Sequence, residues 1–155
     1  MSPVIEERRI PSDSLPKGAR VIAVTYGLAA IITGSFWILG LLSDRLPSPV
    51  KAPTLPEAAT AATTRGFLIA DLVLALPLLL LSAIGIWLRR SWGWVVTYMV
   101  NILWCYSLTV VFIRDIYSTV SPGLVLFSPF VPFAIWSSIY LWQERRSFNI
   151  DSNAV

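Results

Sequence analysis

Two apolar runs joined by a short basic turn constrain the fold of this chain more than any other feature. Residues 69–87 contain a single charged side chain, Asp71, and residues 95–113 contain none. Each run has about 20 residues, the length that crosses ~30 Å of hydrocarbon as an α-helix. The segment between them, 88–94, reads Leu-Arg-Arg-Ser-Trp-Gly-Trp. We therefore expect a helical hairpin that spans a lipid bilayer.

The overall composition supports a membrane location. Apolar residues make up 55% of the 155-residue chain and charged residues 14%, against ~45–50% and ~25% in soluble proteins. The charges gather at the ends of apolar segments, whereas a soluble helix needs a polar face along its length. Two further apolar segments flank the hairpin, so the chain is predicted to be an all-α bundle of four transmembrane helices. The spans are predicted at about 21–42, 66–88, 92–113 and 122–142 in one domain, 20–143, between polar tails 1–19 and 144–155.

The first span has a second interpretation as a secretory signal peptide, because basic residues precede it. The apolar core of a cleaved signal has only about 7–15 residues. The run 21–42 is longer, so a retained span is favoured.

The long connection 43–65 contains the signature of a helix start. Thr54 is placed to cap a helix, Pro56 suits its first turn, and Glu57 meets its positive end. We expect the second helix to begin outside the bilayer and run inward; a plain spacer is the alternative.

The distribution of Lys and Arg predicts the orientation. Four lie in residues 1–20, two in the turn at 89–90 and two after 144, which puts eight on one side and four on the other. Because cytoplasmic loops are enriched in Lys and Arg, both termini are predicted to be cytoplasmic in a multi-pass membrane protein. The mirror topology is the alternative.

Prolines and aromatic residues predict where the helices bend and end. Pro77 should kink the second span, and the last span should be irregular near Pro129 and Pro132. Tryptophan and tyrosine gather at membrane interfaces. The predicted interfacial anchors are Trp87, Trp92, Trp94, Tyr140 and Trp142. Trp104 and Trp136 lie deeper, where they could line a pocket.

Small residues recur on one face of the first span, at Ala23, Gly27, Ala30 and Gly34. Such a face lets two helix backbones approach closely in lipid. We expect it to contact another helix of the same bundle, with a homodimer seam as the alternative.

Asp71 is the first candidate for a functional polar group inside the membrane. An intramembrane carboxylate that faces a cavity can couple protons or cations. Asp71 lies only about one turn inside the predicted outer boundary, so the competing interpretation is an interfacial acid bonded to Thr109, Ser128 or an arginine.

Asn101 is the second candidate and lies near the predicted bilayer centre. Its amide needs partners there because water is absent, and Ser82 on the preceding helix is predicted to supply one. Asparagine at this depth is usually a bond between helices; a ligand contact is the alternative. Cys105, one turn later, is expected to be an inert thiol.

The chain lacks the residues that several kinds of catalytic and metal-binding site require. The chain has no histidine and one cysteine, which excludes a histidine-ligated haem, an HExxH zinc site, a Ser-His-Asp triad and paired-cysteine relays. No glycine-rich phosphate loop or metal-ligand cluster is present, so no catalytic residue, metal or cofactor is predicted. The basic residues flank apolar spans, which argues against binding to nucleic acid.

The layout resembles small four-span bacterial and archaeal membrane proteins of unknown function. The residues that carry the resemblance are the turn at 88–94 between two spans and Tyr26-Gly27-Leu28 in a small-residue first helix. In outline the chain is similar to the DoxX-like group. Four-helix disulfide-forming and quinone-linked enzymes are similar in span count only, because their cysteine pairs are missing here. No functional residue is carried over.

The sequence is compatible with three functions. The first is a non-enzymatic bundle that associates with itself or with a larger membrane complex, in contact with the lipid bilayer. The second is a transporter or channel subunit that uses Asp71, with Pro77 and the broken last helix beside a cavity. The third is a membrane enzyme acting on a lipid or isoprenoid through Asp71 and Asn101.

Overall fold

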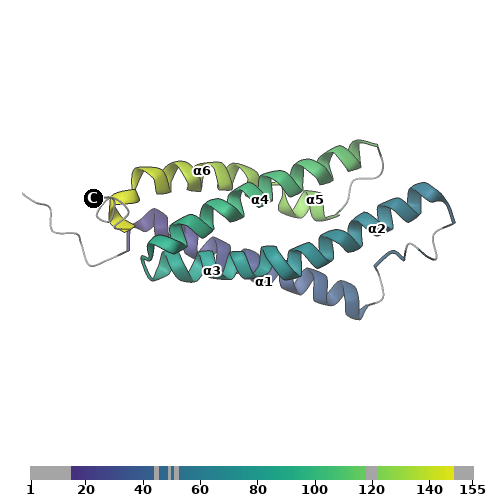
Figure 1. Ribbon diagram of the computed structural model, residues 1–155, viewed down its shortest axis with the longest axis horizontal. Helices are drawn as coiled ribbons and strands as arrows, with labels where there is room; N and C mark the ends of the chain where they lie inside the picture. The colour runs from purple at the N-terminus through teal and green to yellow at the C-terminus, as the bar shows by residue number, and fades with distance from the viewer. Residues whose placement is uncertain (1–14, 44–45, 49, 51–52, 118–121, 149–155) are drawn as a thin grey trace, which may run out of the picture.

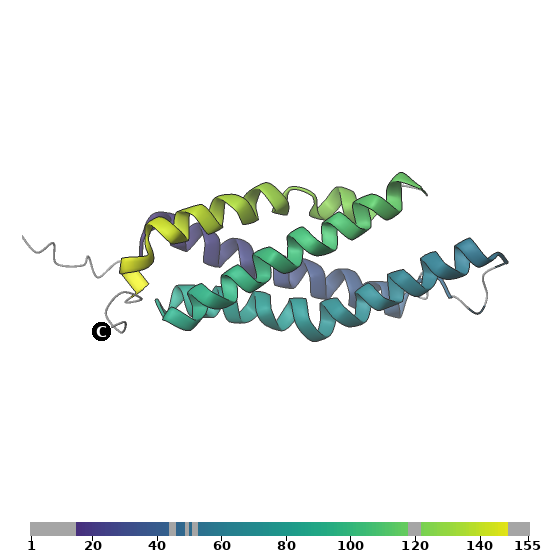
Figure 2. The ribbon, with the colours of Figure 1, turned by 45° about the horizontal axis from the view of Figure 1, so that its top comes forward.

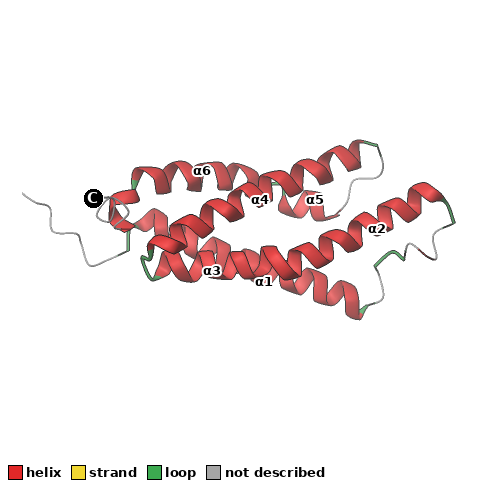
Figure 3. Ribbon diagram, viewed as in Figure 1, coloured by secondary structure: helices red, strands yellow, loops and turns green. Residues whose placement is uncertain are grey.

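The computed structural model describes residues 15–148, apart from 44–45, 49, 51–52 and 118–121. Throughout these residues the regular elements are helical, and together they form an elongated bundle (Figures 1 and 3). In chain order they are α1 (Lys17–Leu42), α2 (Leu55–Ala70), η2 (Asp71–Ala75), α3 (Leu76–Trp87), α4 (Ser91–Ile116), α5 (Pro122–Phe127), α6 (Phe130–Gln143) and η3 (Arg145–Phe148).

In the described part of the chain, four helical segments are long and apolar enough to cross a membrane, which confirms the predicted all-α four-helix bundle. They are Lys17–Leu42, Leu55–Trp87, Ser91–Ile116 and Leu124–Gln143. This composition fits a multi-pass membrane protein. Several helices extend beyond the predicted spans, because polar residues such as Lys17 and Arg114 continue the helix past its apolar part.

The interior combines small, polar and large apolar side chains, and many other large apolar side chains point outward. Ala19, Ala29 and Ala30 are buried with Tyr26, while Ile31 and Ile102 are more than 60% exposed. In water such a surface would be an aggregation hazard. In lipid it is the expected arrangement, because the hydrocarbon solvates apolar side chains and close packing must hold the helices together.

α2, η2 and α3 form one continuous helix, as the sequence predicted. Thr54 Oγ1 accepts a hydrogen bond from the Glu57 N–H at 3.4 Å and caps its start. The disturbance predicted at Pro77 takes the form of a π turn at η2, where the Leu76 N–H donates to the Asp71 carbonyl. Proline has no N–H to donate, and the wider turn accommodates that loss one turn earlier. The helix bends in this region (Figure 2).

The basic turn joins α3 to α4 through a tight reversal. The Arg90 N–H donates to the Gly85 carbonyl at 2.9 Å, and the Arg89 N–H donates to the Ile86 carbonyl at 3.0 Å. This pair of bonds is the Schellman motif, which places one residue in the left-handed region. Arg89 occupies that position with φ 55°.

The last span is broken, but over fewer residues than predicted. α5 ends at Phe127, Ser128 and Pro129 form a turn, and α6 begins at Phe130. The irregular stretch that was predicted to reach Pro132 ends before it, because α6 already begins at Phe130. Pro132 lies in the first turn of α6, where a proline is tolerated because its missing N–H would have had no partner in the helix.

Candidate functional site

A buried polar cluster ties three helices together near the middle of the bundle. The Tyr26 hydroxyl on α1 donates to Asn101 Oδ1 on α4 and lies 2.9 Å from Ser137 Oγ on α6. The Asn101 amide donates to Ser137 Oγ at 3.0 Å and to Ser138 Oγ at 2.7 Å. Tyr26, Asn101 and Ser137 are all buried. The cluster therefore holds α1, α4 and α6 in one register.

The hydrogen-bonding groups of this cluster are satisfied by protein. Ser137 and Ser138 donate to the Ala134 carbonyl at 3.0 and 2.8 Å, and the Tyr98 hydroxyl donates to the Ser138 carbonyl at 2.6 Å. Across the described residues, no buried side-chain nitrogen or oxygen lacks a partner. Saturated polar groups stabilise the contact between helices and leave no donor for a ligand.

The predicted bond between Asn101 and Ser82 is wrong. Ser82 Oγ lies 2.6 Å from Thr97 Oγ1, whose hydroxyl also donates to the Gly93 carbonyl at 2.8 Å. The register explains the difference. Gly85 lies opposite Gly93, so Ser82 meets Thr97, and Asn101 falls one turn beyond Ser82.

Tyr26, Ser137 and Ser138 were not predicted as partners of Asn101. Adjacent hydroxyls in the middle of an apolar span were a usable signal, because each must find a partner in hydrocarbon.

Asp71 bonds to a residue that the sequence did not suggest. The Trp37 indole N–H on α1 donates to Asp71 Oδ2 at 2.8 Å. Trp37 is buried and Asp71 is half-buried at the first residue of the π turn. The contact joins α1 to the irregular part of the second span.

Among the described residues, none of the three kinds of partner predicted for Asp71 is bonded to it. The Thr109 hydroxyl donates to the Cys105 carbonyl, and the Ser128 hydroxyl donates to the Val125 carbonyl. Arg114 pairs with the buried carboxylate of Asp115, at 2.6 Å. Each of these side chains therefore bonds to a group close to it in sequence and not to Asp71.

Acidic groups do not converge on a metal site within the described residues. No group of three His, Cys, Asp or Glu side chains that could hold a metal ion occurs there. Asp44 lies outside the described residues.

The small-residue face of α1 packs inside the bundle. A Cβ added to Gly34 would lie 3.6 Å from Leu76 Cδ1, and one added to Gly27 would lie 3.9 Å from Ala83 Cβ. Ala23 and Ala30 are buried in the same core. This face therefore lies against α3, and a second copy of the chain would have to use another surface.

The predicted anchors gather at one end of the bundle, where the α3–α4 turn lies beside the last residues of α6 (Figure 1). Trp87, Trp92 and Trp142 are exposed there. Trp94 is half-buried and donates its indole N–H to the Leu141 carbonyl at 3.1 Å. Tyr140 lies against Gly18, where any added Cβ would clash with its ring. Trp94 and Tyr140 therefore also pack between helices.

Comparison with known protein families, with curated proteins and with solved structures finds no match to this chain. The outline shared with the DoxX-like group stays a prediction.

Proposed function

We propose that this chain is a non-enzymatic membrane bundle that acts as an accessory or self-associating component. The observation that carries the proposal is the placement of Tyr106. It lies on α4, about 4 Å from the helix midpoint at 1.5 Å per residue, and it is 67% exposed on the outside of the bundle. Its hydroxyl makes no hydrogen bond to the described part of the chain. A hydroxyl in hydrocarbon favours a partner that can bond to it.

The polar groups of the interior differ from Tyr106 in having partners, which supports the same proposal. The polar groups buried between α1, α4 and α6 are bonded to one another, so the outer surface is the part left for recognition. The exposed side chains Met99 and Ile102 lie near Tyr106 on the same helix. Methionine and tyrosine adapt well to protein interfaces.

Native mass analysis after gentle extraction tests this function. We expect the chain to leave the membrane with a second polypeptide, either its own copy or another protein, and Tyr106→Phe to lower the bound fraction. Tyr117→Phe is the matched control, because Tyr117 is also exposed but follows the end of α4. A stable monomer from native membranes, with no effect of Tyr106→Phe, would remove the proposal.

A transporter or channel subunit is the second candidate, and Asp71 favours it. Asp71 is the first residue of a π turn within a membrane-length helix, and such turns are frequent at functional sites. Loss of a measured flux in Asp71→Asn would support this candidate, whereas unchanged flux and pH dependence would count against it. The enzyme alternative gains least, because Asp71 and Asn101 belong to separate hydrogen-bonded groups.

We further propose that both termini face the cytoplasm, on the strength of the Lys and Arg distribution. Labelling of single cysteines introduced at Lys17 and at Glu57, in a Cys105→Ala chain, tests the orientation. An impermeant reagent added outside the cell should reach position 57 and spare position 17.

A further inference from the structure

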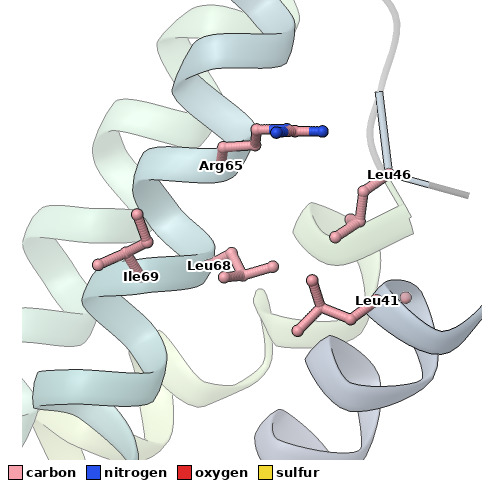
Figure 4. A pocket seen from close by; sticks show the side chains of 6 residues that line it. Leu41, Leu46, Arg65, Leu68 and Ile69 are labelled. Atoms are coloured by element: carbon pink, nitrogen blue, oxygen red, sulfur yellow. The ribbon is translucent and has the colours of Figure 1, made fainter. Parts of the chain in front are cut away.

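A small pocket opens at the end of the bundle opposite the α3–α4 turn. It has a volume of about 220 Å³ and lies between the last turns of α1 and the second half of α2. Its lining residues are Gly40, Leu41, Leu46, Arg65, Leu68 and Ile69. Leu41, Leu46 and Leu68 surround a common apolar space, and the Arg65 side chain extends over it (Figure 4).

Arg65 is held across the mouth of the pocket with hydrogen-bonding capacity to spare. Its Nε–H donates to the Pro47 carbonyl at 3.2 Å. No acidic side chain within the described ranges forms an ion pair with Arg65. The two terminal nitrogens of a guanidinium form a fork that matches phosphate geometry.

The depth of the pocket matches a lipid–water boundary. About 20 residues of helix, at 1.5 Å each, span ~30 Å of hydrocarbon. Counted back from the α3–α4 turn along α3 and α2, this length ends near Leu68. Leu41 and Leu68 then lie at the edge of the hydrocarbon, and Arg65 lies about one turn further out, at headgroup level.

We propose that this pocket binds an anionic phospholipid, with its phosphate on Arg65 and the first carbons of one acyl chain against Leu41, Leu46 and Leu68. The volume is below the ~300–1,000 Å³ of whole small-molecule sites. The remainder of the lipid therefore lies along the outer surface of the bundle, where Leu39 and Ile69 are exposed. The charge of Arg65 favours this occupant, because no acidic side chain of the described residues forms an ion pair with it.

Native mass spectrometry of the full chain tests the site. The protein is exchanged into micelles containing phosphatidylglycerol or phosphatidylcholine with the same acyl chains. We expect preferential retention of one phosphatidylglycerol. Arg65→Gln should weaken this retention about tenfold, as expected for loss of charge-assisted hydrogen bonds. Arg90→Gln is the matched control, because Arg90 is an exposed arginine at the other end of the bundle.

A second variant separates the pocket from simple surface charge. Gly40→Leu fills the apolar space and keeps Arg65; its Cβ would meet the flexible Leu46 side chain at 3.3 Å. We expect it to lower phosphatidylglycerol retention as well, with unchanged helical circular dichroism in both variants. Equal retention of the two lipids, or full retention by Gly40→Leu, would overturn the proposal. So would competition by free inorganic phosphate at the concentration of the lipid, because that result assigns a plain anion site.

This site does not depend on the proposed association of the chain with a partner. Lipid retention by a monomer would leave it intact while removing the partner proposal.

Discussion

Gly85 on α3 and Gly93 on α4 meet backbone to backbone. A Cβ added to Gly93 would lie 2.2 Å from the Gly85 carbonyl carbon, and one added to Gly85 would lie 2.4 Å from Gly93 Cα. No side chain fits between these helices at this level. The contact sets the register of the hairpin, and it brings Ser82 to Thr97 one turn away.

Gly93→Ala should destabilise the hairpin. The added methyl group clashes with backbone atoms, which cannot rotate away as a side chain can, so we expect a loss of about 1–3 kcal/mol. Unfolding in mixed micelles of increasing denaturing detergent measures it. Gly66→Ala is the control, because nothing lies within 4 Å of its added Cβ and alanine favours a helix by up to ~1 kcal/mol. Equal stability of the two variants would contradict the close contact.

Tyr26 and Asn101 should be energetically coupled. In a double-mutant cycle of Tyr26→Phe and Asn101→Leu, we expect a coupling free energy of about 0.6–1.7 kcal/mol, the range for hydrogen bonds between membrane helices. The two side chains share a bond and a third partner, Ser137. Thr109→Val serves as the control, since its exposed hydroxyl bonds only to its own helix. Additive effects of Tyr26→Phe and Asn101→Leu would show that the hydrogen bond between these two side chains does not stabilise the protein.

Trp37→Phe should act through Asp71. The change removes the N–H donor that faces the carboxylate at 2.8 Å, so we expect a loss of about 1–2 kcal/mol beyond the effect on packing. In an Asp71→Leu chain the acceptor is absent, and the same substitution should cost clearly less. Detergent unfolding of the four chains gives the difference, and an identical cost in both backgrounds would rule out the bond as the cause.

The Arg89→Gly variant should be more stable than the Arg89→Ala variant. Its φ of 55° lies in the left-handed region, which costs a side chain about 1–2 kcal/mol and glycine almost nothing. Arg89→Gly and Arg89→Ala both remove the charge, so the difference between their unfolding free energies isolates the backbone. We expect Arg89→Gly to be the more stable by about 1 kcal/mol; the reverse order would mean that the turn has another conformation.

The positions of the helices could be predicted from local sequence patterns. The apolar runs are long and almost free of charge, so they must form helices, because hydrocarbon offers no hydrogen-bond partner to backbone N–H and C=O groups. Thr54, Pro56 and Glu57 marked the start of α2 by capping chemistry alone. Pro77 signalled a disturbed helix, although its form, a π turn that begins at Asp71, depends on the packing around it.

The partners of the polar side chains could not be predicted in the same way. Asn101 was expected to meet Ser82, and Asp71 was expected to meet Thr109, Ser128 or an arginine. Which face of one helix meets another depends on rotation and register, and in this bundle the Gly85–Gly93 contact decides both for α3 and α4. Trp37 was not predicted as a partner of Asp71, yet it is buried and donates to the Asp71 carboxylate on η2.

Photo-crosslinking in native membranes tests the proposed function most directly. A photoreactive amino acid replaces Tyr106 on α4, or Val73 on η2, which is also exposed and lies within the predicted span. We expect a protein adduct of one defined mass from position 106, and only lipid adducts from position 73. Lipid adducts alone from both positions would show that the outer face of α4 contacts the bilayer and would contradict the account.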